Sequence, residues 1–326
     1  MYLSQSSAGI LATEVVPTTP IQDLIYTYDH EAESVGSPSP PIAGFWEVNT
    51  RPGSPIGGTD WRIMAGDDNP IIDGSQYWQT QMVKQSDGSH TRTERAVGNQ
   101  NLPSTNGNTM TSIGDPHYVG VQRYWYGFLF RIDRMDHWQV IGNQGTGGHL
   151  IQFHMWNFAP PDDKNPNFSI RTSGGGLKAY LERNGDNGGA NFFSPAFFSE
   201  SMAGTAGNSY QDGEIHALII ENLMDTRTNA QGGIGELRIY VDDNPIPVWE
   251  WLNKQNVHPQ PDTDNQDPAR HPFFKLGGYR PAFQDFLISI PDGSTQIFSY
   301  DNYTVHGAGA NREGIVEAIG WANRVQ

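Results

Sequence analysis

The sequence predicts an all-β protein in which antiparallel strands form a sandwich or a barrel. The 326 residues include 37 Gly and 22 Pro, and turn-forming clusters recur about every ten residues, as in β-sandwiches and barrels. Stretches with helical periodicity are nearly absent. No break in composition divides the chain, so we expect one large β domain over residues 46–326. Residues 1–45 are rich in Ser, Pro and Thr, and we interpret them as an arm that packs along a sheet edge or connects to something upstream.

Composition and alternation predict the strands in order. The strongest signal is the aromatic stretch Arg123–Ile132. Further strands are expected within 45–72 and near 91–96, 138–141, 150–156, 168–172, 177–182, 214–222, 235–241, 273–280, 286–290 and 296–305. The one segment with weak helical spacing is Asn311–Val325, where Ile315 and Ile319 fall on one side.

Charge and cysteine content exclude several classes of function. Lys and Arg number 20 against 36 Asp and Glu, which gives a formal charge of 20 − 36 = −16. This balance does not suit nucleic acid, and a polyanionic sugar would need a local positive patch. Because there are no cysteines, disulfides, thiolate metal sites, iron–sulfur clusters and cysteine nucleophiles are excluded. The sequence contains no run of about 18 apolar residues, so it predicts no membrane span.

Three short polar motifs lie far apart in the chain. They are Arg-Thr-Glu-Arg at 92–95, Gln-Phe-His at 152–154 and Phe-Phe-Lys-Leu-Gly-Gly-Tyr-Arg at 273–280. Each motif alone has an ordinary interpretation, as surface ion pairs, a half-buried histidine or an amphipathic tyrosine. In a strand, however, residues two or four apart share a face. That rule aligns Arg92 with Glu94, Gln152 with His154, and Lys275 with Tyr279. If the three strands are neighbours, their shared face suits an anionic polymer and proton transfer.

This set of motifs resembles the signature strands of jelly-roll polysaccharide lyases, namely alginate lyases of family 7, glucuronan lyases and heparin lyase I-type enzymes. The resemblance covers residues 75–306 and implies one antiparallel β-jelly roll, a concanavalin-like sandwich with a concave substrate groove. Where the alginate lyase pattern has a second Arg, this chain has Ala96, and Arg95 takes the apolar position. After Tyr279, Arg280-Pro281 replaces Asn-Gln and looks more like the glucuronan and heparin lyase branch.

The resemblance implies β-elimination on a uronic-acid-containing polysaccharide, which leaves 4,5-unsaturated uronate ends. Gln152 and Arg92 would neutralise the uronate carboxylate, so that negative charge can develop on it in the transition state. His154 would donate to the carboxylate or act as base. Tyr279 would take the C5 proton, protonate the leaving oxygen, or do both. The expected substrate-binding residues are Lys275, Glu94, Arg95, Arg280, His149 and Trp156.

The expected partner is an acidic polysaccharide such as alginate or glucuronan, since the low basic count disfavours heavily sulfated heparin. Trp125, Tyr126 and Trp156 are core residues or sugar platforms, and alternation leaves both interpretations open. We expect no nucleic-acid or membrane partner and a monomer. We also expect a secreted or periplasmic protein whose leader is not present in this chain.

Two other classes of function were weighed against the lyase. A non-catalytic carbohydrate-binding or phage-appendage module would keep the fold, but it has no need for Gln152, His154 and Tyr279 together. A glycoside hydrolase would need paired carboxylates, and no Glu-x-Asp-x-x-Glu run is present. No cofactor is required for β-elimination. The acidic run Asp262–Asp267 lacks the Gly and distal Glu of a calcium loop, which favours a solvated loop and leaves a structural calcium ion as an alternative.

Overall fold

A computed structural model describes the parts of the chain that form the two sheets and the C-terminal helix. The described residues are 24–28, 45–48, 61–65, 76–83, 93–97, 121–135, 149–155, 168–173, 176–181, 192–193, 198–199, 214–225, 232, 234–242, 244–252, 272–279 and 291–323. The expected strands at 138–141 and 286–290 and the acidic run at 262–267 lie outside them. No helix among these residues is long and apolar enough to cross a membrane.

The first sheet has the strand order β14-β13-β12-β6-β16-β4-β3, and β1 also pairs with β16. Its members are β1 (Leu24–Tyr28), β3 (Trp61–Ala65), β4 (Gln76–Val83), β6 (Val121–Met135), β12 (His216–Asp225), β13 (Glu236–Val241), β14 (Trp249–Leu252) and β16 (Thr295–His306). β16 pairs with β4 through 295–300 and with β1 through 303–306. Part of the predicted N-terminal arm is therefore a strand of this sheet.

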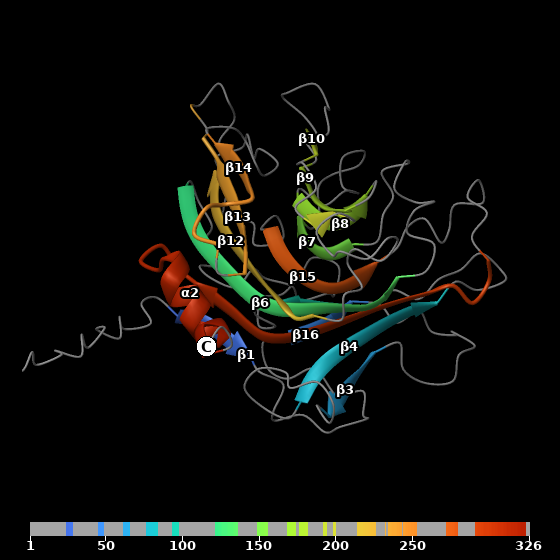
Figure 1. The fold of residues 1–326 in the computed structure, drawn as a ribbon. Coiled ribbons are helices and arrows are strands. Elements are labelled where there is room, and N and C mark those ends of the chain that lie inside the picture. The colour runs from blue at the N-terminus through green and yellow to red at the C-terminus, as the bar shows by residue number, and fades with distance from the viewer. Residues whose placement is uncertain are drawn as a thin grey trace, which may run out of the picture.

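The second sheet has the order β10-β9-β8-β7-β15-β5-β2, and β11 also pairs with β9. Its members are β2 (Phe45–Val48), β5 (Thr93–Val97), β7 (His149–Met155), β8 (Phe168–Ser173), β9 (Gly176–Leu181), β10 (Phe192–Phe193), β11 (Phe198–Ser199) and β15 (Pro272–Tyr279). All strand pairs of both sheets are antiparallel, and β15, β7 and β8 lie over the curved strands β6 and β16 (Figure 1). The chain passes repeatedly from one sheet to the other, which confirms the predicted antiparallel jelly roll.

The main core fills the space between the two sheets. Phe128, Phe130 and Ile132 alternate along β6 and are buried there, as strand geometry requires of residues two apart. Tyr126 belongs to the same core and meets Phe153 of the second sheet edge to face, with 4.9 Å between ring centroids. Burial raises the pKa of Tyr126 well above its ordinary value, so this phenol stays neutral. Tyr126 is thus a core residue and not a sugar platform.

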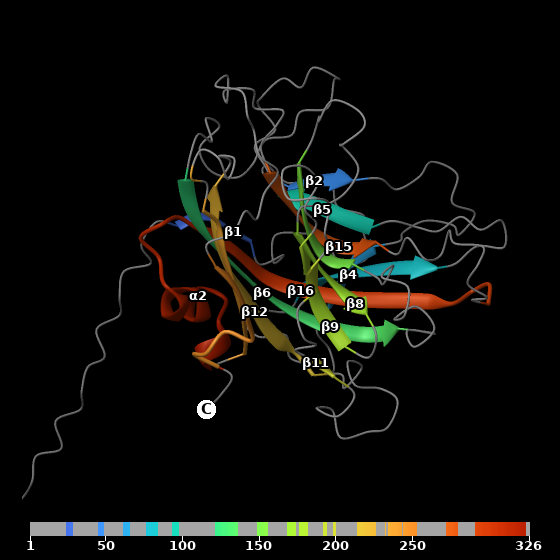
Figure 2. The same ribbon diagram turned by 90° about the horizontal axis from the view of Figure 1, so that it is seen from above.

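A second, smaller core lies on the outer face of the first sheet, beneath α2 (Arg312–Ala318) and the 3₁₀ helix η4 (Trp321–Asn323). Figures 1 and 2 show α2 beside β6 and β12. Trp125 packs here, so it too is a core residue. The Asn311 side chain caps α2 by accepting a hydrogen bond from the Gly314 amide at 2.9 Å. The helix is shorter than the predicted segment, but Ile315 and Ile319 are both fully buried as their spacing indicated.

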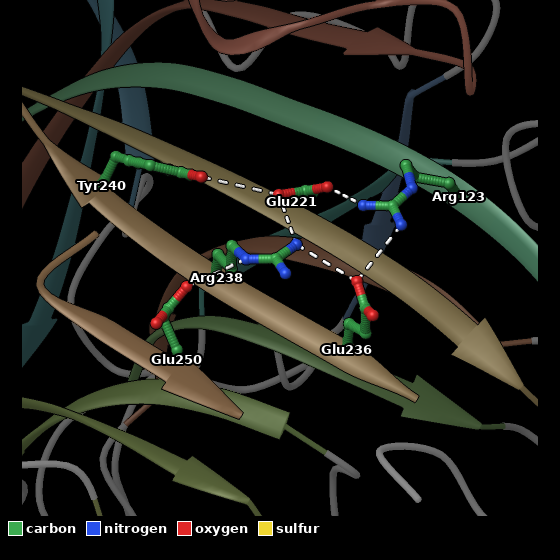
Figure 3. A network of polar contacts seen from close by, with 6 residues as sticks. All are labelled: Arg123, Glu221, Glu236, Arg238, Tyr240 and Glu250. Atoms are coloured by element: carbon green, nitrogen blue, oxygen red, sulfur yellow. Dashed lines mark hydrogen bonds and ion pairs between the residues drawn. The ribbon is translucent and has the colours of Figure 1, made fainter. Parts of the chain in front are cut away.

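Charged side chains cover another part of the same outer face (Figure 3). Arg238 on β13 bonds Glu221 on β12 at 3.0 Å, Glu236 at 3.1 Å and Glu250 on β14 at 3.0 Å. Arg123 on β6 pairs with Glu221 and with Glu236. These contacts join four neighbouring strands across one surface. We interpret the network as a structural one that fixes the strand register.

Gly127 on β6 lets α2 approach the sheet. A Cβ at this position would lie 2.3 Å from Cγ2 of Ile315 and 3.0 Å from Cγ2 of Ile319. We therefore expect Gly127→Ala to lower the free energy of unfolding by about 1–3 kcal/mol, because the helix must shift outward. Chemical denaturation of the variant measures this cost. In an Ile315→Ala background, which makes room for the new methyl group, the same change should cost little, and an equal cost in both backgrounds would contradict this packing.

Candidate active site

The three motif strands are neighbours in the second sheet. β15 lies between β5, which carries Thr93–Val97, and β7, which carries His149–Met155. Figure 2 shows β5 and β15 side by side. The predicted shared face required the three motif strands to be neighbours in one sheet, and they are. Three segments that lie far apart in the chain therefore meet in one three-stranded unit.

The register aligns the polar positions of the motifs. Lys275 pairs with Gln152 on β7 and with Ala96 on β5. Gly277 pairs with Glu94, and Phe273 pairs with His154. Directly opposite residues share a face, with about 5 Å between their Cβ atoms. The backbone thus places the first, second and third motifs along one side of the sheet.

That side points away from the first sheet, and we call it the motif face. Ile151, Leu276 and Ile170 pair across β7, β15 and β8 and are buried in the main core. Because successive residues alternate between faces, Gln152 and its β8 partner Ser169 lie on the opposite side. Gln152 is 1% exposed. A buried amide on this face is suited to bind a polar group from which water is excluded.

An irregularity in β7 brings His149 to the motif face. His149 and Gln152 are three positions apart, so regular alternation would place them on opposite sides of the sheet. The register with β8 shifts between His149 and Ile151, and both Leu150 and Ile151 are buried in the core. This β-bulge leaves His149 opposite Arg171, on the same face as Gln152. His149 is 3% exposed.

A second irregularity, in β15, sets the position of Tyr279. The register with β7 shifts between Leu276 and Tyr279, so that Tyr279 pairs with His149. Gly277, within the shifted segment, has a φ of 123°, a conformation that residues with a Cβ rarely adopt. Gly277 of the third motif therefore has a structural reason. It allows the backbone register in which Tyr279 pairs with His149 of the neighbouring strand.

The structure describes some of the predicted site residues more fully than others. Arg92, Arg280 and Trp156 lie outside the described residues. Glu94, Arg95, His154, Lys275 and Tyr279 are placed by their backbone register only. Arg95 pairs with Leu276, whose side chain lies in the core, whereas Glu94 pairs with Gly277. The individual roles of these residues stay predictions.

The motif face continues over two strands that the sequence did not mark as functional. β8 and β9 form the predicted hairpin, with Ser169 opposite Tyr180 and Arg171 opposite Lys178. The guanidinium carbon of Arg171 lies 3.3 Å from the ring centroid of Tyr180, a close cation–π contact. Alternation within the hairpin could have indicated these positions once its register with β7 was known.

Other polar groups of the described structure belong elsewhere. A surface pocket lies on the first sheet and is lined by Tyr77, Leu129, Phe130, Arg131, Ile215, Ser299, Tyr300 and Asp301. The main core separates it from the motif face, so we do not assign it to this site. Among the residues that the structure describes, no three His, Asp or Glu side chains gather as a metal site.

Comparison with known proteins agrees with this geometry. A model of the polysaccharide lyase family matches residues 62–303. The chain therefore belongs to the polysaccharide lyase family. As a member of this family, the protein is a lyase, and its substrate is a polysaccharide. No curated protein is similar enough in sequence to count as a relative.

Solved structures are similar to this chain at low sequence identity. The endo-β-1,4-glucuronan lyase from the fungus Trichoderma reesei superposes with a TM-score of 0.53 and 14% identity, over 87% of this chain and 96% of that chain. The alginate lyase A1-II′, a member of polysaccharide lyase family 7, gives a TM-score of 0.41 and 11% identity, over 74% and 83%. The binding domain of Paraclostridial Mosquitocidal Protein 1 gives 0.47 and 12%, over 93% and 52%.

The bulge in β7 is held from the opposite sheet, and this contact can be tested. The Tyr300 hydroxyl on β16 donates a hydrogen bond of 3.0 Å to the backbone carbonyl of Leu150. Tyr300→Phe should lower the free energy of unfolding by about 1–2 kcal/mol, because the buried carbonyl loses its donor. We expect it also to lower kcat on the polysaccharide. Ile220→Val, a core change of similar cost on β12, should leave kcat unchanged, and equal kcat values for the two variants would contradict the coupling.

The positive φ of Gly277 gives a second test. Gly277→Ala should lower the free energy of unfolding by about 1–2 kcal/mol, because a Cβ is strained in this conformation. It should also abolish most activity, since Tyr279 loses its register with His149. Gly232→Ala is the matched control, because Gly232 has a φ of 77° and nothing within 4 Å of its Cβ position. Activity and thermal unfolding of both variants would be compared, and an active Gly277→Ala protein would refute this role.

Proposed function

We propose that this lyase cleaves a uronic-acid-containing polysaccharide by β-elimination and leaves a 4,5-unsaturated uronate at the new end. The observation that carries the proposal is the alignment of the three motifs on neighbouring strands. Gln152 pairs with Lys275, and His149 pairs with Tyr279, in two adjacent rows of the motif face. Residues that carry an amide, an ammonium group, an imidazole and a phenol therefore pair in two neighbouring rows of the sheet.

The chemistry needs such a set because the C5 proton of a uronate is a very weak acid. Its removal pushes negative charge onto the adjacent carboxylate. Hydrogen-bond donors that are already oriented toward that carboxylate stabilise the transition state without further reorganisation. The buried amide of Gln152 fits this task, and Arg92 is proposed to share it. Burial strengthens the effect, since electrostatic interactions weaken steeply with exposure to water.

Proton transfer is assigned to Tyr279 together with a histidine. Tyr279 is proposed to take the C5 proton, to protonate the leaving C4 oxygen, or to do both. Cations at Lys275 and Arg92 would favour the phenolate by electrostatic attraction. His154 is the predicted partner on the carboxylate side. The register adds His149, which pairs directly with Tyr279 and can exchange a proton with it or orient it.

The proposed substrates are glucuronan and alginate, and glucuronan is favoured. The segment Arg280-Pro281 after Tyr279 is closer to the pattern of glucuronan and heparin lyases than to that of alginate lyases. The superposed fungal enzyme acts on glucuronan, and we extend that substrate class to this chain as a proposal. Only 20 Lys and Arg stand against 36 acidic residues, which disfavours a heavily sulfated polymer. Secretion and a monomeric state stay predictions.

The test is a comparison of wild type and Tyr279→Phe on glucuronan, alginate, heparin and ulvan. Unsaturated uronate ends absorb in the ultraviolet, so product formation can be followed directly. We expect product from glucuronan or alginate with wild type, and a rate at least about a hundredfold lower with Tyr279→Phe, because proton transfer is lost.

Tyr240→Phe is the matched control for this substitution. Tyr240 lies on the outer face of the first sheet, where its hydroxyl is 3.5 Å from Glu221. Loss of this hydroxyl should leave the rate unchanged. If wild type binds these polymers but forms no ultraviolet-absorbing product from any of them, β-elimination is not its reaction on uronates.

A further inference from the structure

Two side chains of β8 extend the motif face beyond the three motifs. Ser169 pairs with Gln152, and Arg171 pairs with His149. Both are buried, with Ser169 0% and Arg171 7% exposed. Neither residue belongs to a motif that the sequence singled out. Their positions nevertheless continue, by one strand, the same two rows that hold the proposed catalytic groups.

The Ser169 hydroxyl has no protein partner in the described structure. Its Oγ is fully buried and forms no hydrogen bond to any described residue. A buried hydroxyl without a partner is destabilising, and such groups are rare in native proteins. The hydroxyl lies on the motif face beside Gln152, where a ligand would supply its missing partner.

Arg171 is oriented for the same task by Tyr180. The guanidinium carbon of Arg171 lies 3.3 Å from the ring centroid of Tyr180. A guanidinium stacked face-on upon a ring keeps its N–H donors in a plane parallel to that ring, where they can reach a ligand. Those donors match the two oxygens of a carboxylate, which a lysine ammonium does not. On β9, Lys178 pairs with Arg171 in register and forms no ion pair with the described residues. Among the described residues, this end of the motif face therefore carries two basic side chains, Arg171 and Lys178.

We propose that Ser169 and Arg171, supported by Tyr180, form a subsite for the carboxylate of the sugar next to the uronate that is cleaved. The inference rests on the proposed function, in which Gln152 holds the carboxylate at the cleavage point. Adjacent strands lie about 4.8 Å apart, which is comparable with the length of one sugar ring. A polymer that crosses from β7 to β8 thus brings its next residue over Ser169 and Arg171.

The test measures binding without cleavage. In a Tyr279→Phe background, tetrasaccharides of glucuronan and of alginate would be titrated by calorimetry, alongside the same tetrasaccharides with their carboxyl groups reduced to alcohols. Ser169→Ala and Arg171→Lys should each weaken binding of a charged tetrasaccharide by about tenfold, because each removes a bond to a carboxylate. Neither change should alter the affinity for the reduced forms.

Stability separates this role from a structural one. Ser169→Ala should leave the melting temperature unchanged or raise it, because it removes a buried hydroxyl that has no protein partner. Thr80→Val removes a similarly unpartnered buried hydroxyl on β4, and Arg238→Lys alters an arginine of the first sheet. Both controls should leave the affinity unchanged.

The outcomes distinguish this proposal from the catalytic one. Unchanged affinity in both β8 variants would overturn the subsite, whether or not wild type produces unsaturated uronate. Absence of any binding by either charged tetrasaccharide would overturn it as well. If binding depends on Ser169 and Arg171 but wild type yields no unsaturated product, the subsite stands and β-elimination fails.

Discussion

The site depends on the packing of apolar side chains on the inner face of the second sheet. Ile151, Ile170 and Leu276 pair across three strands and are all buried in the main core. A slip of one residue in any of these strands would turn its apolar set outward, so the register is strongly fixed. Gln152 and its neighbours on the motif face inherit their alignment from this packing. Core residues thus position polar groups that they do not contact.

The bulge in β7 shows how the two sheets act together. It allows both Leu150 and Ile151 to face the core while His149 and Gln152 face the other way. A bulge leaves backbone groups outside the regular ladder, and a buried carbonyl without a donor is costly. Tyr300 of the first sheet supplies that donor at Leu150. One phenol in the core therefore stabilises the local geometry on which the pairing of His149 with Tyr279 depends.

Local alternation predicted an all-β sandwich or barrel and most of its strands, and the resemblance of the three motifs to those of jelly-roll lyases implied the jelly roll. Adjacency of the three motif strands was a condition of the interpretation, and the register of β5, β15 and β7 meets it. The sequence could not decide whether Trp125 and Tyr126 face a core or the solvent. β6 is covered on one face by the second sheet and on the other by α2, so both residues are buried and the polar alternation is lost. The bulge at Leu150 could not be predicted either, because an extra residue shifts the alternation of side chains between the two faces without changing the composition of the strand. Ser169 and Arg171 became candidates only through their register with β7.

The net charge of −16 repels the proposed anionic substrate, but this repulsion is limited by distance. On the first sheet, Arg123 and Arg238 are engaged by Glu221, Glu236 and Glu250 and add little to the field elsewhere. At physiological salt, exposed charges are screened beyond about 8 Å. Among the described side chains of the motif face, the charged ones are Arg171 and Lys178, and the backbone register adds Lys275 and Glu94. Burial protects the contacts of Gln152 and His149 from screening. We therefore expect the acidic surface to affect how fast the proposed polyanionic substrate approaches, and the short-range donors of the second sheet to determine how it is held.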